Sequence, residues 1–174
     1  MKILVAGIGN IFHGDDAFGV EVARRLLERG SLPPEARVVD FGIRGFDLAY
    51  TLLEDYDLTI LVDATSRGGP PGTLYTIEID GNAPAGPGEP GADVATHGMN
   101  PMRVLSMARA MGGAMGRILL LGCEPETLGS EEEGQMGLSA AVAGVVDTAA
   151  DLVEKLVRKT LQASPGVADN RVTA

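Results

Sequence analysis

The first twenty residues, MKILVAGIGNIFHGDDAFGV (1–20), decide the fold. An apolar run at 3–6 leads into the sequence GIG (7–9), a pattern typical of a buried strand that ends in a tight turn. From Asp15 to about Glu28, apolar residues return every three or four positions, which predicts a helix that ends at Gly30. A strand, a turn and a helix in this order predict the first unit of a layered α/β fold.

The same alternation of short apolar runs and helical segments continues along the chain. Further buried strands are predicted at 38–39, 58–62 and 118–121, and the alternating pattern at 74–79 predicts an edge or antiparallel strand. Helices are predicted from Phe46 to about Glu54, from Pro101 with Asn100 as its cap, and from Ser139 as a cap to about Lys159. The sequence therefore predicts a three-layer α/β/α sandwich around a mostly parallel sheet of about five strands.

Composition indicates one ordinary globular domain. The chain has 174 residues, 45% hydrophobic and 22% charged, and we predict that the domain spans 1–161 and that 162–174 form a disordered tail. The net charge of −10, from 14 basic and 24 acidic residues, disfavours nucleic acid and anionic membrane surfaces as partners. A single cysteine, with neither a signal-peptide pattern nor a long apolar stretch, favours a cytoplasmic protein.

Polar side chains that follow the strands are the first candidates for a site, because ligands of such sheets bind outside the carboxyl ends of the strands. The candidates are Asp15 and Asp16 after the first strand, Asp40 after the second, Asp63 after the third, and His97 after a Gly- and Pro-rich loop at 81–92. Each also has a structural interpretation. Asp15 or Asp16 could cap the following helix, Asp40 and Asp63 could form turns, and His97 could be a solvated loop residue like His13.

Three common kinds of site are disfavoured. A dinucleotide fingerprint would need a glycine where Phe12 stands, so the first helix is not expected to pack close to the sheet in the usual way. Cys123 ends a buried strand and is expected to be structural, and the chain has no His-Glu-x-x-His stretch. What remains is a possible metal site of two carboxylates and one imidazole, Asp16, Asp63 and His97, which suits zinc or nickel and leaves positions open.

Several blocks of the sequence are similar in order and spacing to those of one known family. They are Gly7-Ile8-Gly9-Asn10, Gly14-Asp15-Asp16-Ala17-Phe18-Gly19-Val20, Val62-Asp63-Ala64, Thr96-His97-Gly98 and the shorter Cys123-Glu124-Pro125-Glu126 and Gly137-Leu138-Ser139. From Met1 to about Leu161 the chain resembles the nickel–iron hydrogenase maturation proteases.

This resemblance implies an endopeptidase that removes a short C-terminal extension from a hydrogenase large-subunit precursor after nickel insertion. It places the nickel-contacting residues on Asp16, Asp63 and His97, where Asp16 stands for a more common Glu. Nickel would be carried by the substrate, and zinc or another divalent metal could take its place; whether nickel also acts in the chemical step stays open. The family's Asp-Gly-Gly-Thr-x-Gly block falls on residues 40–45 with two departures, Phe41 and Ile43, so Asp40 is a further candidate for an acid or base role.

Two other functions stay open at this point. A peptidyl-tRNA hydrolase has a similar fold in outline, but the net charge of −10 disfavours a tRNA substrate. A nickel-sensing or metallochaperone module could use the same three ligands without cutting a peptide bond.

Overall fold

The computed structural model of the chain describes residues 1–80, 100–129 and 134–163. The predicted loop at 81–92 and His97 lie outside these ranges. The predicted tail begins too early, because the last helix continues to Ala163; residues 164–174 lie outside the described ranges.

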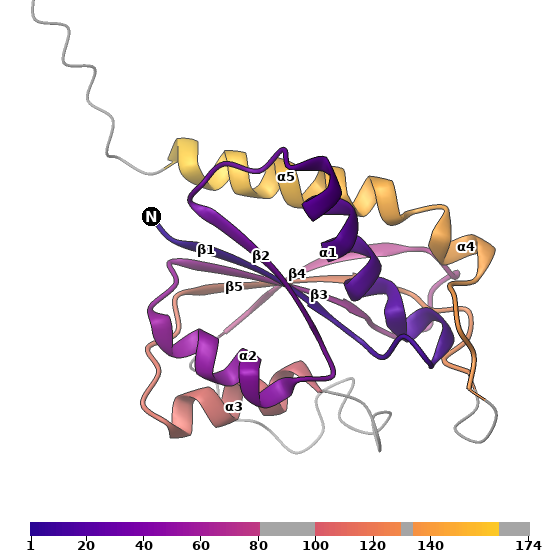
Figure 1. Cartoon of the computed structure of the whole chain (residues 1–174), viewed down its shortest axis with the longest axis horizontal. Coiled ribbons are helices and arrows are strands. Elements are labelled where there is room, and N and C mark those ends of the chain that lie inside the picture. The colour runs from indigo at the N-terminus through magenta and orange to yellow at the C-terminus, as the bar shows by residue number, and fades with distance from the viewer. Residues whose placement is uncertain (81–99, 130–133, 164–174) are drawn as a thin grey trace, which may run out of the picture.

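A five-stranded sheet forms the middle layer of the molecule, with the strand order β2-β1-β3-β5-β4 (Figure 1). Four strands are parallel, and β4 runs antiparallel to β5 at one edge. The strands are β1 (Ile3–Ile8), β2 (Ala36–Gly42), β3 (Leu58–Ala64), β4 (Leu74–Ile79) and β5 (Arg117–Cys123). The predicted mostly parallel sheet with one antiparallel edge strand is therefore confirmed.

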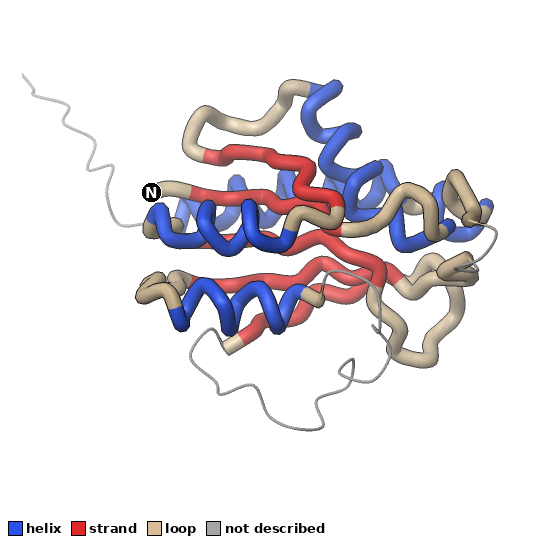
Figure 2. Tube along the Cα trace, turned by 60° about the horizontal axis from the view of Figure 1, so that its bottom comes forward, coloured by secondary structure: helices blue, strands red, loops and turns tan. Residues whose placement is uncertain are grey.

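Helices cover both faces of the sheet, as predicted for a three-layer sandwich. One face carries α1 (Phe18–Arg29) and α5 (Val146–Ala163), and the other carries α2 (Gly45–Thr51) and α3 (Pro101–Ala110) (Figures 1 and 2). Shorter segments are the 3-10 turns η1 (Gly14–Ala17) and η2 (Leu52–Glu54) and the helix α4 (Ala140–Ala143).

The helix expected from Ser139 onward is in fact two helices. Ser139 caps α4, since its hydroxyl accepts a hydrogen bond from the N–H of Val142, as Asn100 caps α3. The chain then tightens at Gly144 and Val145, where the Val145 N–H bonds to the carbonyl of Val142 only three residues back. This 3-10 step ends α4 before α5 begins.

The core follows from the alternation of side chains along the strands. In β1, Ile3 and Val5 pack toward α1 and α5, whereas Leu4, Ala6 and Ile8 pack toward α2 and α3. All five side chains are fully buried. A continuous apolar run is what a strand covered on both faces requires.

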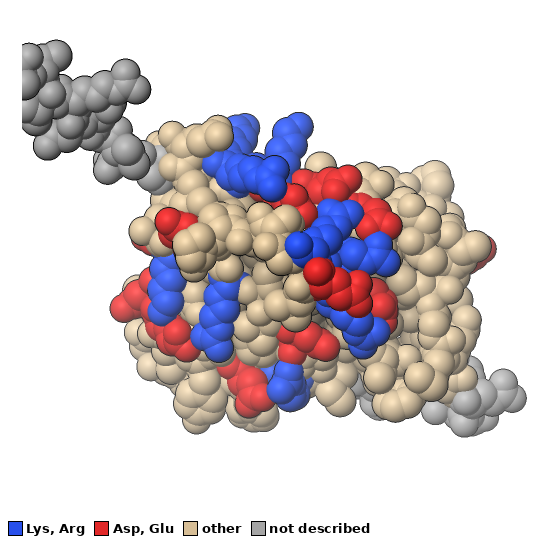
Figure 3. All heavy atoms as spheres, turned by 45° about the horizontal axis from the view of Figure 1, so that its top comes forward, with Lys and Arg blue, Asp and Glu red and all other residues tan. Residues whose placement is uncertain are grey.

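Salt bridges join α1 to α5 on the outer surface. Arg29 lies within 3.2 Å of carboxylate oxygens of Asp147, Asp151 and Glu154, and Arg25 also contacts Asp147. Figure 3 shows acidic and basic side chains interleaved on this face. Exposed pairs of this kind contribute little individually. In the described residues, no helix is long and apolar enough to cross a bilayer.

The first helix packs closely on the sheet, contrary to the expectation drawn from Phe12. The close contact is made by Gly19, where an added Cβ would lie 2.0 Å from the carbonyl oxygen of Val62 and 2.3 Å from that of Ile8. A Cβ on Gly7 would in turn lie 2.4 Å from the carbonyl oxygen of Gly19. Gly7 and Gly19 thus allow the close contact that a dinucleotide fingerprint would obtain from a glycine at position 12. Because they have no side chain, the start of α1 lies against the ends of β1 and β3.

This contact predicts the effect of adding one methyl group. Gly19→Ala is expected to lower the free energy of unfolding by about 3 kcal/mol, because the methyl would overlap backbone carbonyl groups that cannot move independently. Gly30→Ala is the control: Gly30 has a left-handed φ of 56° but open space around it, so only about 1 kcal/mol is expected. Urea unfolding of both variants measures the difference, and equal losses would contradict the proposed close contact.

Candidate functional site

The candidate site lies where the order of the strands reverses. The strand β2 lies on one side of β1 and β3 lies on the other, so the connections that leave β1 and β3 run in opposite directions. Sheets of this kind bind ligands in the crevice between the carboxyl ends of two such strands. Asp16 follows β1 in the turn η1, and Asp63 is the last residue but one of β3. Two of the predicted site residues therefore meet at the expected position.

Asp16 is held by the backbone of the turn that leaves β1. Its Oδ2 accepts a hydrogen bond of 2.6 Å from the N–H of Asn10. The turn can close because Gly9 has a φ of 141° and no side chain; a Cβ there would lie 1.7 Å from the carbonyl oxygen of Asp16. Burial raises the pKa of Asp16 above its usual range, although the Asn10 N–H and the nearby His13 oppose this increase.

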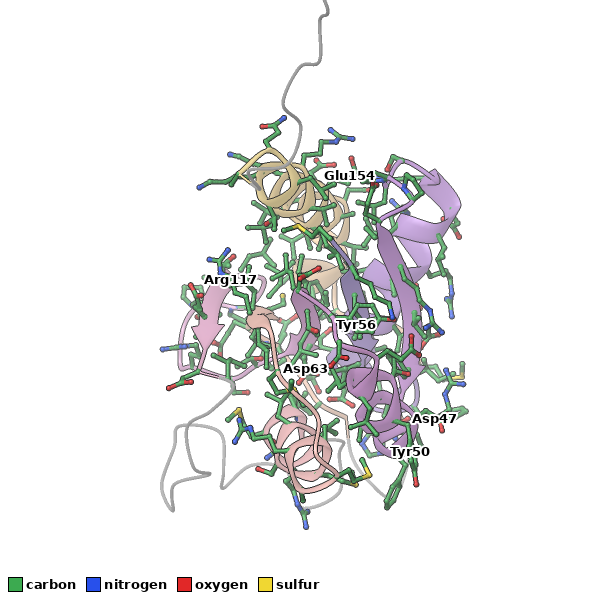
Figure 4. All side chains as sticks on the ribbon, turned by 90° about the vertical axis from the view of Figure 1, so that its left-hand side faces the viewer. Asp47, Tyr50, Tyr56, Asp63, Arg117 and Glu154 are labelled. Carbon is green, nitrogen blue, oxygen red and sulfur yellow. The ribbon has the colours of Figure 1, made fainter. Side chains whose placement is uncertain are left out.

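Asp63 is more deeply buried than Asp16. Asp63 comes two residues after Leu61, so the two side chains lie on the same face of β3. Leu61 packs toward α2 and α3, and Figure 4 shows Asp63 on that side of the sheet. Only 8% of the residue is exposed. Burial is the main cause that raises the pKa of Asp63 well above its usual range, and the negative charge of Asp16 raises it further against the opposing N–H of Ala64.

The two carboxyl groups act on each other electrostatically at a place where water screens them little. Asp63 is buried and Asp16 is half-buried. Acids removed from water are costly to ionise, so such a pair favours the binding of a proton or a cation. Within the described ranges, no three His, Cys, Asp or Glu side chains are grouped closely enough to hold a metal ion. Of the three predicted ligands, the structure thus places Asp16 and Asp63 at one end of the sheet, and His97 lies outside those ranges.

Asp40 lies apart from this pair. It is at the end of β2, with β1 between it and β3, and its Cα pairs with that of Gly7. The guanidinium of Arg44 donates hydrogen bonds to the main-chain carbonyls of Asp40 and Phe41. The Oδ1 atom of Asp40 lies 3.7 Å from where a Cβ on Gly42 would be, two residues further along the same strand.

Asp15 has a structural role, but it is not the helix cap that the sequence suggested. Neither η1 nor α1 has a side-chain cap. The carboxylate of Asp15 instead accepts hydrogen bonds from the backbone N–H groups of Glu126, Thr127 and Ser139, more than a hundred residues away. Asp15 and Asp16 are neighbours with different environments, one fully hydrogen-bonded and the other not.

Glu124 is a buried acid that sequence reasoning did not single out as a site residue. It follows β5 and accepts hydrogen bonds from the backbone N–H groups of Arg67 and Gly68 and from the hydroxyl of Tyr75. Burial is the largest influence on its pKa and raises it, but these hydrogen bonds together lower the pKa below its usual range. Its position after a buried strand was the available signal, and its role is to hold the loop after β3.

The structure supports the expectation that Cys123 is not a nucleophile. The thiol is fully buried, and burial together with the charges of Asp15 and Glu124 raises its pKa to about 12. A thiol with such a pKa is protonated at neutral pH and unreactive.

Comparison with known proteins shows which family the chain resembles. A family model described as hydrogenase maturation protease matches residues 20–156. The hydrogenase expression/formation protein HupD of Rhodobacter capsulatus is 36% identical over 156 residues, which cover 89% of this chain and 71% of the relative. The hydrogenase 2 maturation protease of Escherichia coli is 29% identical over 160 residues, which cover 92% of this chain and 93% of the relative.

Solved structures show the same similarity over nearly the whole chain. The hydrogenase maturating endopeptidase HybD from E. coli gives a TM-score of 0.71 at 27% identity and covers 92% of this chain and 94% of its own. The [NiFe] hydrogenase maturation protease HycI from Thermococcus kodakarensis gives 0.65 at 29% identity, with coverages of 90% and 92%. The chain thus shares sequence and fold with these proteins, and it belongs to the hydrogenase maturation protease family.

Proposed function

We propose that this protein is an endopeptidase that removes the C-terminal extension of a nickel–iron hydrogenase large-subunit precursor after nickel insertion. The relatives named as maturation proteases support a substrate of this class. The observation that carries the proposal is the pair of carboxyl groups at the reversal point of the sheet, Asp63 buried and Asp16 half-buried, both with a pKa raised by burial. A pair of this kind lowers the stability of the fold and is kept where a cation is to be recognised.

Nickel enters this proposal as part of the substrate. A precursor that carries the ion brings a positive charge that balances the negative charges of Asp16 and Asp63. A precursor without the ion leaves these charges unbalanced. Asp16, Asp63 and His97 recognise the ion, and the protease thereby distinguishes a loaded precursor from an empty one. Asp40, at the neighbouring strand end, is the proposed further acid or base. Zinc or another divalent ion in the precursor could be accepted in place of nickel.

The proposal is tested by offering the protein nickel-loaded, zinc-loaded and metal-free precursor and measuring the mass of the products. We expect shortening of the nickel-loaded precursor, none of the metal-free form, and loss of at least about 100-fold in rate for His97→Ala, because the site would lose one of its three ligands. A change in metal content without shortening would instead identify a metallochaperone. Equal cleavage of loaded and empty precursor would contradict nickel recognition, and a normal rate for His97→Ala would remove His97 from the site.

A second prediction separates function from stability at Asp63. The folded-state pKa of Asp63 lies above its unfolded value, so its contribution to stability is present at low pH and lost as the pH rises through the folded-state pKa. Asp63→Asn removes the buried charge and keeps the size of the side chain. We therefore expect this variant to lose cleavage, and we expect its melting temperature at neutral pH to rise above that of the natural protein. The difference between the two melting temperatures should become smaller as the pH falls toward about 4.

Glu124→Gln is the matched control, since Glu124 is also a buried acid next to a strand end but has a lowered pKa. Its contribution to stability is present above the unfolded pKa and lost at low pH, so Glu124→Gln should lower the melting temperature at neutral pH. If Asp63→Asn instead melts at a lower temperature and cleaves at a near-normal rate, Asp63 is a structural turn residue.

A further inference from the structure

The carboxylate of Asp15 joins three distant segments of the chain. Its Oδ2 accepts hydrogen bonds from the N–H groups of Glu126 at 2.8 Å and Thr127 at 3.0 Å, and its Oδ1 accepts one from Ser139 at 2.6 Å. The residue is fully buried. A carboxylate accepts hydrogen bonds without donating any, so three N–H donors match it chemically and compensate for its burial.

The backbone of the same turn is tied to the same segments. The Asp15 N–H donates to the carbonyl of Thr127 at 2.9 Å, so these two residues are bonded reciprocally. The Gly14 N–H donates to the carbonyl of Gln135, whose own N–H donates to Phe12. The turn η1 is therefore held from outside by the segment after β5 and by the residues that lead into α4, while its other side faces β3.

This arrangement bears directly on Asp16, the next residue. Asp16 belongs to the turn η1, and its carboxylate is held by the N–H of Asn10 in the segment that leads from β1 into this turn, so the position of Asp16 relative to Asp63 follows the position of η1 on β3. Displacement by about 1 Å at a site of this kind can reduce a rate by about 100-fold. The hydrogen bonds that attach the turn to distant segments therefore also fix the distance between Asp16 and Asp63.

We propose that Asp15 is a positioning residue for the maturation reaction: its carboxylate clamps η1 onto Glu126, Thr127 and Ser139 and so fixes Asp16 beside Asp63. This inference rests on the proposed function, because it acts through Asp16. According to this inference, the segment after β5 and the cap of α4 help to position Asp16, although neither provides a side chain to the site.

The clamp can be loosened from either side. Asp15→Asn presents an amide N–H₂ where one carboxylate oxygen stood, which sets a donor against an N–H donor. Ser139→Pro removes the Ser139 N–H without changing any charge, and its φ of −60° already suits proline. Ser139→Ala loses only the capping hydroxyl, so a difference between the Pro and Ala variants reports on the backbone hydrogen bond to Asp15. Val153→Ala, a buried residue of α5, is the control for a loss of stability alone.

The experiment measures kcat and KM on nickel-loaded precursor at a temperature at which melting curves show every variant to be folded. We expect Asp15→Asn and Ser139→Pro to lose about 10- to 100-fold in kcat/KM, Ser139→Ala much less, and Val153→Ala to keep the natural value despite its lower melting temperature. Natural kinetics for folded Asp15→Asn, or equal kinetics for Ser139→Pro and Ser139→Ala, would overturn the inference. Asp16→Asn is measured beside them: if it cleaves normally, the proposed function of the site has failed rather than the clamp.

Discussion

The site depends on the close contact between the start of α1 and the carboxyl ends of β1 and β3. Gly19 allows this contact, because any side chain there would overlap the carbonyl groups of Ile8 and Val62. Gly9 allows the return of the turn between β1 and the helix, since a Cβ there would collide with the carbonyl of Asp16. These two glycines allow Asp16 of the first turn to lie next to Asp63 of the third strand.

Four buried or half-buried acids at this end of the sheet have two different kinds of environment. Asp15 and Glu124 each accept hydrogen bonds from backbone N–H groups of distant segments, which makes them parts of the scaffold. Asp16 and Asp63 have few donors: burial raises the pKa of both, and the negative charge of Asp16 raises that of Asp63 further. Sites of function commonly hold groups that cost stability within a scaffold of well-satisfied ones.

Sequence reasoning could predict the architecture and the two central acids, because both follow from local patterns. Apolar runs locate the strands, and a polar residue at the end of such a run locates Asp63. The partners of Asp15 could not be predicted, because they lie 111, 112 and 124 residues away and no local pattern connects them. The close packing at Gly19 was missed for a related reason: the expectation considered only the spacing of the dinucleotide fingerprint. The roles of Asp16, Asp63, His97 and Asp40 in the reaction stay predictions.

The central claim is that Asp16 and Asp63 form one electrostatically coupled pair, and a double-mutant cycle on stability tests it most directly. Asp16→Asn, Asp63→Asn and the double variant would be unfolded in urea at pH 7. An amide oxygen at position 16 can still accept the N–H of Asn10, so the cycle isolates the charges. The account predicts that each single variant gains stability and that the double variant gains less than the sum by about 1 kcal/mol, because the first substitution already removes the repulsion. Additive effects, or a loss of stability in both single variants, would contradict it.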